Sequence, residues 1–302
     1  MRDLLSYSER HLDETLGAIE TLAGLESPST DKAAVDRCGE VLARMLREIG
    51  ADVETRPQQD RGNHVRAHLV GDRGRVLLLG HIDTVWPLGT LGRMPLRRDG
   101  DRLYGPGVFD MKAGVAIALT AMAALRASGV PRPSIVTLWT TDEEIGSQTS
   151  RGMIEQEAKA ASAVFVLEPP LADGALKTAR KGCGEFELTV DGVAAHAGVD
   201  PTRGASAIHE LADQIAAIER LQDPVHGVSI NVGVMSGGTR PNVVAEHAAA
   251  VIDVRAPTMR QAAEVEAALR ALQPRRPGTR LTIRGGFSRP PMERTAGTAV
   301  LF

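Results

Sequence analysis

Apolar residues recur with two different periods along the first half of the chain. A helical period is found in residues 8–23, 33–49 and 113–126. Short apolar runs or a loose alternation, both typical of strands, are found in residues 64–70, 75–80, 135–140 and 164–167. Strands and helices that alternate in this way predict an α/β fold with a mostly parallel sheet and flanking helices.

The pattern changes near residue 178. Strands are predicted at 185–190, 228–235, 248–254 and 280–284, and helices at 206–221 and from Thr258 onward. The order βαββαβ is that of a ferredoxin-like α+β domain, a small antiparallel sheet with helices on one face. We therefore expect one domain made of residues 1–177 plus 288–302, and an inserted domain at 178–287.

Polar residues mark where three of these helices should begin. Ser6 and Glu9 have the spacing of a capping box, and so do Thr258 and Gln261. Any residue of the Ser-Thr-Asp sequence at 29–31 could cap the second helix.

Composition narrows the class of protein. A chain of 302 residues with 43% hydrophobic and 24% charged residues is typical of a globular protein. The net charge of −3 and the absence of a signal-like or spanning segment predict no nucleic-acid partner and no membrane. The two cysteines, Cys38 and Cys183, form no metal-type or disulfide pattern, which favours a reducing compartment. The expected location is the cytoplasm.

Four short motifs place histidine or acidic side chains at or just beyond the predicted strand ends. They are Gly-His-Ile-Asp at 80–83, Phe-Asp-Met-Lys at 109–112, Asp-Glu-Glu at 142–144 and Leu-Glu-Pro at 167–169. Each motif alone is more typical of a surface pair, a loop or a helix cap. Because parallel sheets bind ligands beyond the carboxyl ends of their strands, four such motifs together predict a hydrolytic site for two metal ions.

A two-metal site needs a bridging carboxylate, terminal nitrogen or oxygen ligands and a general base. Asp110 is suited to bridge, with His81, Glu144 and Glu168 as terminal ligands. Asp83 follows His81 by two residues and is placed to accept a hydrogen bond from the imidazole nitrogen that faces away from the metal.

Glu143 and Glu144 should have different roles. Neighbouring side chains in an extended segment point to opposite sides, so only one of the two is expected to bind metal. The other, beside a metal-bound water, could take its proton and pass it to the leaving amine.

These motifs closely resemble those of the M20 metallopeptidase family, especially its glutamate carboxypeptidase branch, over nearly the whole chain. The resemblance implies that His81 and Glu168 bind one zinc ion, Glu144 binds the other, Asp110 bridges them and Glu143 is the general base. It also implies that the domain at 178–287 is a lid through which the chain forms a homodimer.

Further residues resemble family positions that contact substrate. The segment at 195–198 is similar to a motif whose histidine, here His196, reaches the partner subunit's active site and polarises the scissile carbonyl. Arg240, Asn242 and Arg255 resemble substrate-binding positions. Arg289 resembles the arginine that pairs with a substrate's free carboxylate, a task that suits the planar guanidinium group.

The chain departs from the family pattern at its end. Family members continue for several tens of residues beyond the position of Phe302, to a histidine that completes the shell of the second metal. Of the matched motifs, only Asp110 and Glu144 serve that metal, so its affinity is expected to fall sharply.

Three functions follow from this sequence. The first is a zinc-dependent, carboxypeptidase-like hydrolase that cleaves a peptide or amide bond through metal-bound water, with Glu143 as the base. The second is an N-acyl amino acid amidohydrolase with the same chemistry, and the third is a truncated, inactive module that dimerises or binds a ligand. Zinc is the default metal, although cobalt or manganese also suits a histidine and carboxylate set.

Overall fold

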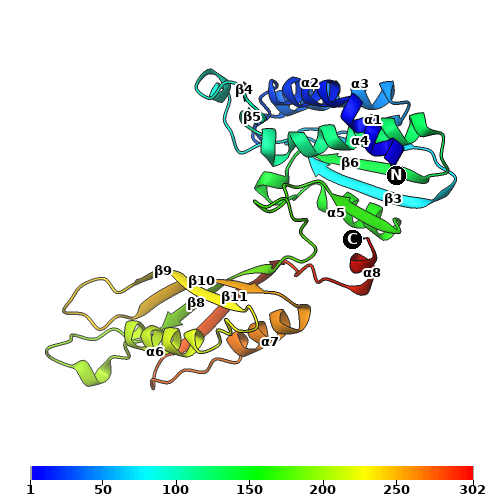
Figure 1. Ribbon diagram of the computed structural model, residues 1–302. Helices are drawn as coiled ribbons and strands as arrows, with labels where there is room; N and C mark the ends of the chain where they lie inside the picture. Colours follow the sequence, from blue (N-terminus) through cyan, green and yellow to red (C-terminus); the bar gives the residue numbers. More distant parts are fainter. Residues whose placement is uncertain (1, 302) are drawn as a thin grey trace. The chain divides into compact units, whose positions relative to one another are not determined.

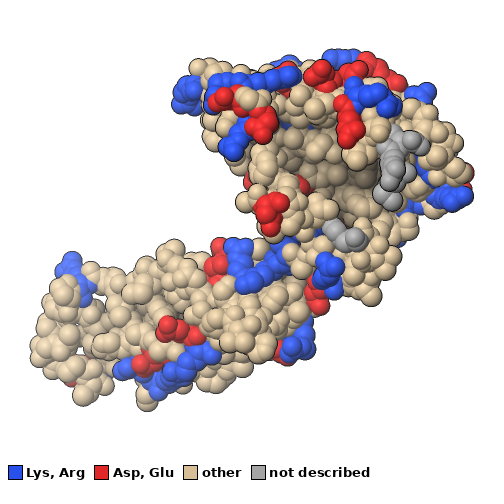
Figure 2. Space-filling model, viewed as in Figure 1, with Lys and Arg blue, Asp and Glu red and all other residues tan. Residues whose placement is uncertain are grey.

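The computed structural model describes residues 2–301, which form two compact units that meet in sequence at Pro170 and Leu171. Residues 171–177 and 288–301, which we expected in the first domain, belong to the second unit. The reason is local: strand β11 (Arg280–Arg289) continues past its predicted end, and Met292 then pairs with Arg180. On the visible face, acidic and basic side chains are both present and interspersed (Figure 2).

A five-stranded sheet forms the centre of the first unit (Figure 1). Its strands are β1 (Asp52–Arg56), β2 (His64–Leu69), β3 (Arg73–His81), β6 (Pro133–Thr140) and β7 (Ala163–Val166). Their spatial order is β1-β2-β6-β3-β7. β2 is antiparallel to both of its neighbours, whereas β6, β3 and β7 are parallel. Since only β2 is reversed, the predicted mostly parallel sheet is confirmed.

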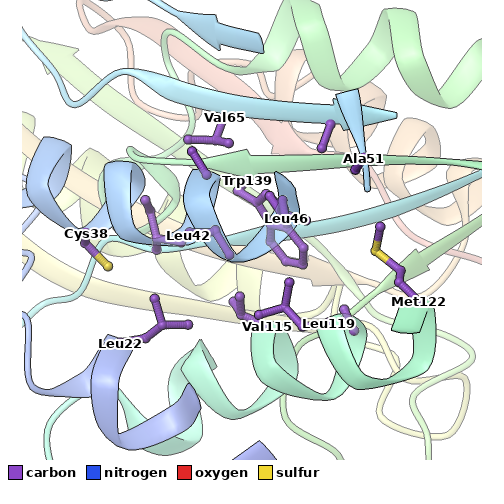
Figure 3. Close-up of a cluster of buried hydrophobic side chains, with 14 of the residues drawn as sticks. Leu22, Cys38, Leu42, Leu46, Ala51, Val65, Val115, Leu119, Met122 and Trp139 are labelled. Carbon is purple, nitrogen blue, oxygen red and sulfur yellow. The ribbon is translucent and has the colours of Figure 1, made fainter. Parts of the chain in front are cut away.

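Helices pack on both faces of this sheet. On one face lie α2 (Leu12–Ala23), α3 (Lys32–Glu48) and α4 (Ala113–Ser128), and their side chains form one core with Val65 and Trp139 (Figure 3). On the other face, α5 (Arg151–Lys159) packs Met153 and Ile154 against Leu77 and Leu138. The remaining helix, α1 (Arg2–Arg10), contacts α2 and α4.

Helix α4 is unusually apolar. The segment Val108–Ser128 is long and apolar enough to cross a membrane by length and composition, which our sequence analysis did not expect. In the structure its buried residues, among them Val115, Leu119 and Met122, pack in the core described above.

Elements that the sequence pattern does not predict are short or lack a buried face. β1 is an exposed edge strand, α5 has no fully buried residue, and β4 (Arg97–Asp99) and β5 (Arg102–Tyr104) form a small hairpin. The expected cap at Ser6 is not formed, because Ser6 lies inside α1. Asp31 caps α3 by accepting a hydrogen bond from the Ala34 N–H at 2.9 Å.

The second unit has the predicted βαββαβ order. Its elements are β8 (Gly182–Asp191), α6 (Ala207–Glu219), β9 (Ser229–Gly237), β10 (His247–Ala256), α7 (Met259–Arg270) and β11, followed by the short α8 (Ala296–Val300). The sheet order is β11-β8-β10-β9, and every pairing is antiparallel. Figure 1 shows α6 and α7 on one face of this sheet, so the ferredoxin-like arrangement is confirmed.

Strict alternation along β8 separates the two faces of the sheet. Phe186, Leu188 and Val190 are buried in the core under the helices. Cys183 and Glu185 lie on the opposite, helix-free face. Thr258 caps α7 as predicted, because its hydroxyl oxygen accepts a hydrogen bond from the Gln261 N–H at 3.2 Å.

A buried carboxylate anchors the loop after α7. Glu210 of α6 accepts hydrogen bonds from the backbone N–H groups of Arg275 and Arg276 at 3.1 and 2.6 Å, from Gln214 Nε2 at 2.6 Å and from Thr279 Oγ1 at 3.2 Å. Burial raises the pKa of this carboxyl, but the hydrogen bonds outweigh burial and lower the pKa below its ordinary value. The ionised group therefore stabilises the fold.

The substitution Glu210→Gln tests this anchor. It puts a donor amide against N–H groups, and we expect it to destabilise the second unit by about 1–3 kcal/mol at neutral pH. Because the folded pKa is lowered, the stabilisation is present above the unfolded pKa of about 4.3 and is lost as the pH falls through the folded pKa. Urea unfolding at neutral and acidic pH should therefore show a difference from wild type that shrinks on acidification. Glu219→Gln, at the exposed end of the same helix, is the control, and an equal effect of both substitutions would contradict the anchor.

Candidate metal centre

Parallel strands bring the predicted ligands to one edge of the first sheet. β3 ends at His81, η3 (Glu143–Ile145) follows β6, and Glu168 follows β7. The fourth predicted ligand, Asp110, lies in η2 (Val108–Lys112), the turn that leads into α4. Carboxyl ends of adjacent parallel strands meet at the same edge, so residues far apart in sequence become neighbours.

Gly80 makes room for this arrangement. A Cβ atom at this position would lie 2.8 Å from Trp139 Cζ3 and 2.9 Å from Met111 Cε. Met111 in turn accepts a hydrogen bond from the His81 N–H at its sulfur atom, at 3.2 Å. The absence of a side chain at residue 80 thus lets the turn with Asp110 pack against the end of β3.

Two groups of potential ligand atoms share the His81 imidazole. One consists of His81, Glu143 and Glu168, the other of His81, Asp110 and Glu144, and within each group the ligand atoms lie within 4.8 Å of one another. His81 Nε2 is 3.0 Å from Asp110 Oδ1 and 3.7 Å from Glu168 Oε1. Imidazole and carboxylate groups are the donors that hydrolytic zinc sites use, so these residues fit a divalent cation.

The charges of the site also fit a cation. Burial lowers the pKa of His81, but hydrogen bonds to Asp110 and Asp83 and the charges of Asp83 and Glu168 outweigh it and raise the pKa to about 11. Burial raises the pKa of Glu144, and the charges of Asp110, Glu143 and Asp83 raise it further, against the opposing effect of His81. Several carboxylates around one imidazole are therefore stabilised by added positive charge.

Asp83 is fully buried and holds two parts of the site together. His81 Nδ1 lies 3.0 Å from the backbone oxygen of Asp83 and 3.5 Å from its carboxylate. The nearer partner of the imidazole is therefore the backbone oxygen, not the side chain that we expected. The carboxylate accepts hydrogen bonds from the Ser29 hydroxyl at 2.6 Å and from the N–H groups of Glu143 and Glu144, each at 3.3 Å.

Lys112 stabilises the backbone next to His81 and Asp83, a role that the sequence analysis did not assign. It is fully buried, and its Nζ donates hydrogen bonds to Leu22 O at 3.0 Å, Leu25 O at 2.8 Å and Ser27 Oγ at 2.8 Å. Ser27 Oγ in turn donates to Ile82 O at 2.6 Å, beside His81 and Asp83. A lysine inside the otherwise apolar run from 111 to 119 is the sequence signal that could have identified it.

The second unit holds the predicted substrate-binding residues in two groups. His196 pairs with Val243, and Ala197 N donates to Asn242 O at 3.0 Å, so His196, Asn242 and the nearby Arg240 belong to adjoining loops. Arg255 and Arg289 instead lie on strands on either side of β8, and both are in register with Cys183.

These two groups lie at opposite ends of the second sheet. The loop with Asn242 leads into β10 at His247, whereas Arg255 is near the other end of that strand. Eight residues of extended chain span roughly 25 Å. Arg255 also forms a two-point ion pair with Asp253, at 2.9 Å for both contacts, and contacts the Cys183 sulfur.

Comparison with known proteins agrees with this division of the chain. Residues 64–177 match the model of peptidase family M28, and residues 178–275 match the peptidase dimerisation domain of the M20 type. Carboxypeptidase G2 of a Pseudomonas species is 32% identical over 243 residues, which are 78% of this chain and 58% of that protein. Acetylornithine deacetylase of Klebsiella pneumoniae is 28% identical over 254 residues, 78% of this chain and 65% of the relative.

Solved structures show the same fold. Aminopeptidase PepT of Bacillus cereus superposes with a TM-score of 0.79 at 20% identity and covers 96% of this chain and 79% of its own. The chain spans 58% of the length of carboxypeptidase G2 and 65% of the length of acetylornithine deacetylase. Its two matched domains are those of M28 and M20-type peptidases, and its similarity to carboxypeptidase G2 extends over most of the chain.

Proposed function

We propose that this chain is the metal-binding part of a hydrolase that cleaves a peptide or amide bond, with carboxypeptidase-like specificity. The observation that carries the proposal is the gathering of His81, Asp110, Glu143, Glu144 and Glu168 at one edge of the parallel sheet. Relatives named carboxypeptidase and deacetylase support the same chemistry, since both names describe hydrolysis of a bond between an acyl group and nitrogen.

Zinc is the proposed metal, with His81 and Glu168 as ligands at one position, Glu144 at the other and Asp110 between them. The 3.0 Å distance from His81 Nε2 to Asp110 places these two groups within reach of a common ion. When bound, a divalent cation would make a water molecule more acidic and polarise the scissile carbonyl. Cobalt or manganese would suit the same donors.

Glu143 is the proposed general base. Its carboxylate lies within 4.8 Å of potential ligand atoms of His81 and Glu168. Asp83 accepts a hydrogen bond from the Glu143 backbone N–H and so fixes the position of that backbone. A carboxylate in this position can accept a proton from the attacking water and pass it to the leaving nitrogen.

Substrate binding is assigned to the second unit. We propose that Arg289, on an exposed part of β11, pairs with a free carboxylate of a small peptide or N-acyl amino acid, with Arg255, across β8 on strand β10, as a second binding residue. The separation of about 25 Å between this pair and the loops of His196, Arg240 and Asn242 supports a homodimer, because one small substrate cannot reach both groups of a single second unit. In that dimer, His196, Arg240 and Asn242 would serve the partner's substrate.

Two other functions share parts of this structure. An N-acyl amino acid amidohydrolase would use the same metal site, and the deacetylase relative favours it. A non-catalytic module that only dimerises through the second unit is favoured by the dimerisation-domain match alone. We propose a cytoplasmic location, in keeping with the free thiols of Cys38 and Cys183.

Metal content separates the hydrolase from the module. Elemental analysis of the purified chain should find bound zinc, and a chelator should abolish hydrolysis of peptide and N-acyl substrates. Size-exclusion chromatography on the same sample reports the dimer. A stable dimer without metal or hydrolysis would favour the module and contradict the enzyme.

Glu143→Ala should separate catalysis from metal binding. We expect kcat to fall about 10²- to 10⁴-fold, the usual contribution of a general acid/base, with the metal content unchanged. Glu144→Ala is the matched variant on the adjacent residue and should lose metal as well as activity. Equal metal loss in both variants would show that the two glutamates do not divide their roles as proposed.

Arg289→Ala should affect binding of the substrate carboxylate. Loss of a charge-assisted hydrogen-bond pair costs about 1.5–3 kcal/mol, so KM for substrates with a free terminal carboxylate should rise about 10- to 100-fold. The corresponding carboxamide substrate should respond little. Arg284→Ala, on an exposed position of the same strand, is the control. An unchanged KM in Arg289→Ala would point to another anchor.

A further inference from the structure

The turn that carries Glu143 and Glu144 is closed by its own first residue. Asp142 is fully buried, and its Oδ2 accepts hydrogen bonds from Thr149 N at 2.6 Å, Thr149 Oγ1 at 2.8 Å and Ser150 N at 3.3 Å. Its backbone oxygen accepts another from Ser147 N at 2.7 Å. The segment from 142 to 150 therefore forms a closed loop just before α5.

His64 joins the two ends of this loop. It is fully buried at the start of β2, with Nδ1 2.9 Å from Thr141 Oγ1 and Nε2 3.1 Å from Thr149 Oγ1. Thr141 precedes Asp142, and Thr149 contacts the Asp142 carboxylate, so one imidazole contacts both sides of the segment that contains Glu143 and Glu144.

The segment before His64 is itself fixed. The Thr141 hydroxyl donates a hydrogen bond to Gly62 O, and a Cβ atom on Gly62 would lie 2.5 Å from Val35 Cγ1. Lys32 Nζ donates to Arg61 O at 3.0 Å and to Asn63 Oδ1 at 2.8 Å. His64 thus connects the loop to α3 and β2, which belong to the rigid core of the first unit.

The opposite side of the turn is held less tightly. There, the Asp83 carboxylate accepts hydrogen bonds from the N–H groups of Glu143 and Glu144, and both distances are 3.3 Å, at the long end of the range for such bonds. These contacts hold the backbone of Glu143 and Glu144 close to Asp83. The orientation of the turn is left to the contacts of Asp142, Thr149 and His64.

We propose that His64, acting through Thr141 and Thr149, is a positioning residue that sets the orientation of Glu143 and Glu144 toward the metal centre. The hydrogen-bond partners of the imidazole are Thr141 and Thr149, so its proposed effect is exerted by fixing the loop. Its effect on turnover rests on the proposed function, whereas its effect on metal binding can be measured without turnover.

Thr149 offers a matched pair of substitutions, because the residue is exposed and its hydroxyl contacts both His64 and the Asp142 carboxylate. Thr149→Val removes the hydroxyl at nearly constant shape, and Thr149→Ser keeps it. Cobalt(II) is the probe, titrated into metal-free protein and followed by its visible absorption spectrum. We expect Thr149→Val to lower the Co²⁺ affinity about 10- to 100-fold, as loss of a residue that orients metal ligands usually does, and to change the spectrum. Thr149→Ser should restore both.

His64→Leu should also weaken Co²⁺ binding, and the double variant with Thr149→Val should lose less affinity than the sum of the two single losses, because both substitutions remove the His64–Thr149 contact. With the Co²⁺-loaded protein, kcat should fall and KM should stay unchanged. His68→Leu is the control, because His68 lies four residues after His64 on the same face of β2. If His64→Leu does not fold, the Thr149 pair decides alone.

Two results would overturn the positioning role. One is unchanged Co²⁺ affinity and spectrum in Thr149→Val, and the other is an equal loss in Thr149→Val and Thr149→Ser. Wild-type protein that binds Co²⁺ but hydrolyses nothing would contradict the proposed function and leave this comparison valid. Wild-type protein that binds no Co²⁺ would overturn both.

Discussion

The concentration of negative charge at one edge of a parallel sheet is the constraint on which the first unit depends. Three strands with a common direction bring His81, the turn at 142–147 and Glu168 to this edge, and η2 adds Asp110. Carboxylates so close together repel one another, and burial adds to the cost. The fold meets this constraint with neutral hydrogen-bond donors around the fully buried Asp83 and with a single shared imidazole.

Most of the supporting contacts come from the backbone side of the site. Buried Lys112 donates hydrogen bonds to carbonyl groups of the segment at 22–25 and to the Ser27 hydroxyl. Ser27 in turn donates to the carbonyl group of Ile82, the residue after His81. The residues that make these contacts are not metal ligands. They nevertheless limit how far each predicted ligand can move. The site is therefore better described as four loops fixed to a common core than as a set of side chains.

The parts of this structure that the sequence predicts are those with a strong local pattern. Buried strands such as β6, the capped helix that starts after Thr258 and the His-x-Asp and Asp-Glu-Glu motifs all have such a pattern. The sequence could not reveal the edge strand β1, whose side chains are mostly exposed, or the extension of β11 beyond residue 284. His64 was missed for another reason: its partners Thr141 and Thr149 lie 77 and 85 residues away, and threonine hydroxyls have no motif of their own.

The sharing of His81 by both ligand groups has a chemical consequence for metal choice. Nε2 is the ring nitrogen that faces the carboxylates of Asp110 and Glu168, and one nitrogen lone pair can bind one ion. An ion that binds this lone pair therefore has a nitrogen donor, and the other members of both ligand groups are carboxylate oxygens. Oxygen-only shells favour harder cations such as manganese or magnesium, whereas imidazole favours zinc. An ion that takes the shared Nε2 would therefore be bound through the nitrogen that favours zinc, and the two ligand groups cannot both use this imidazole at the same time.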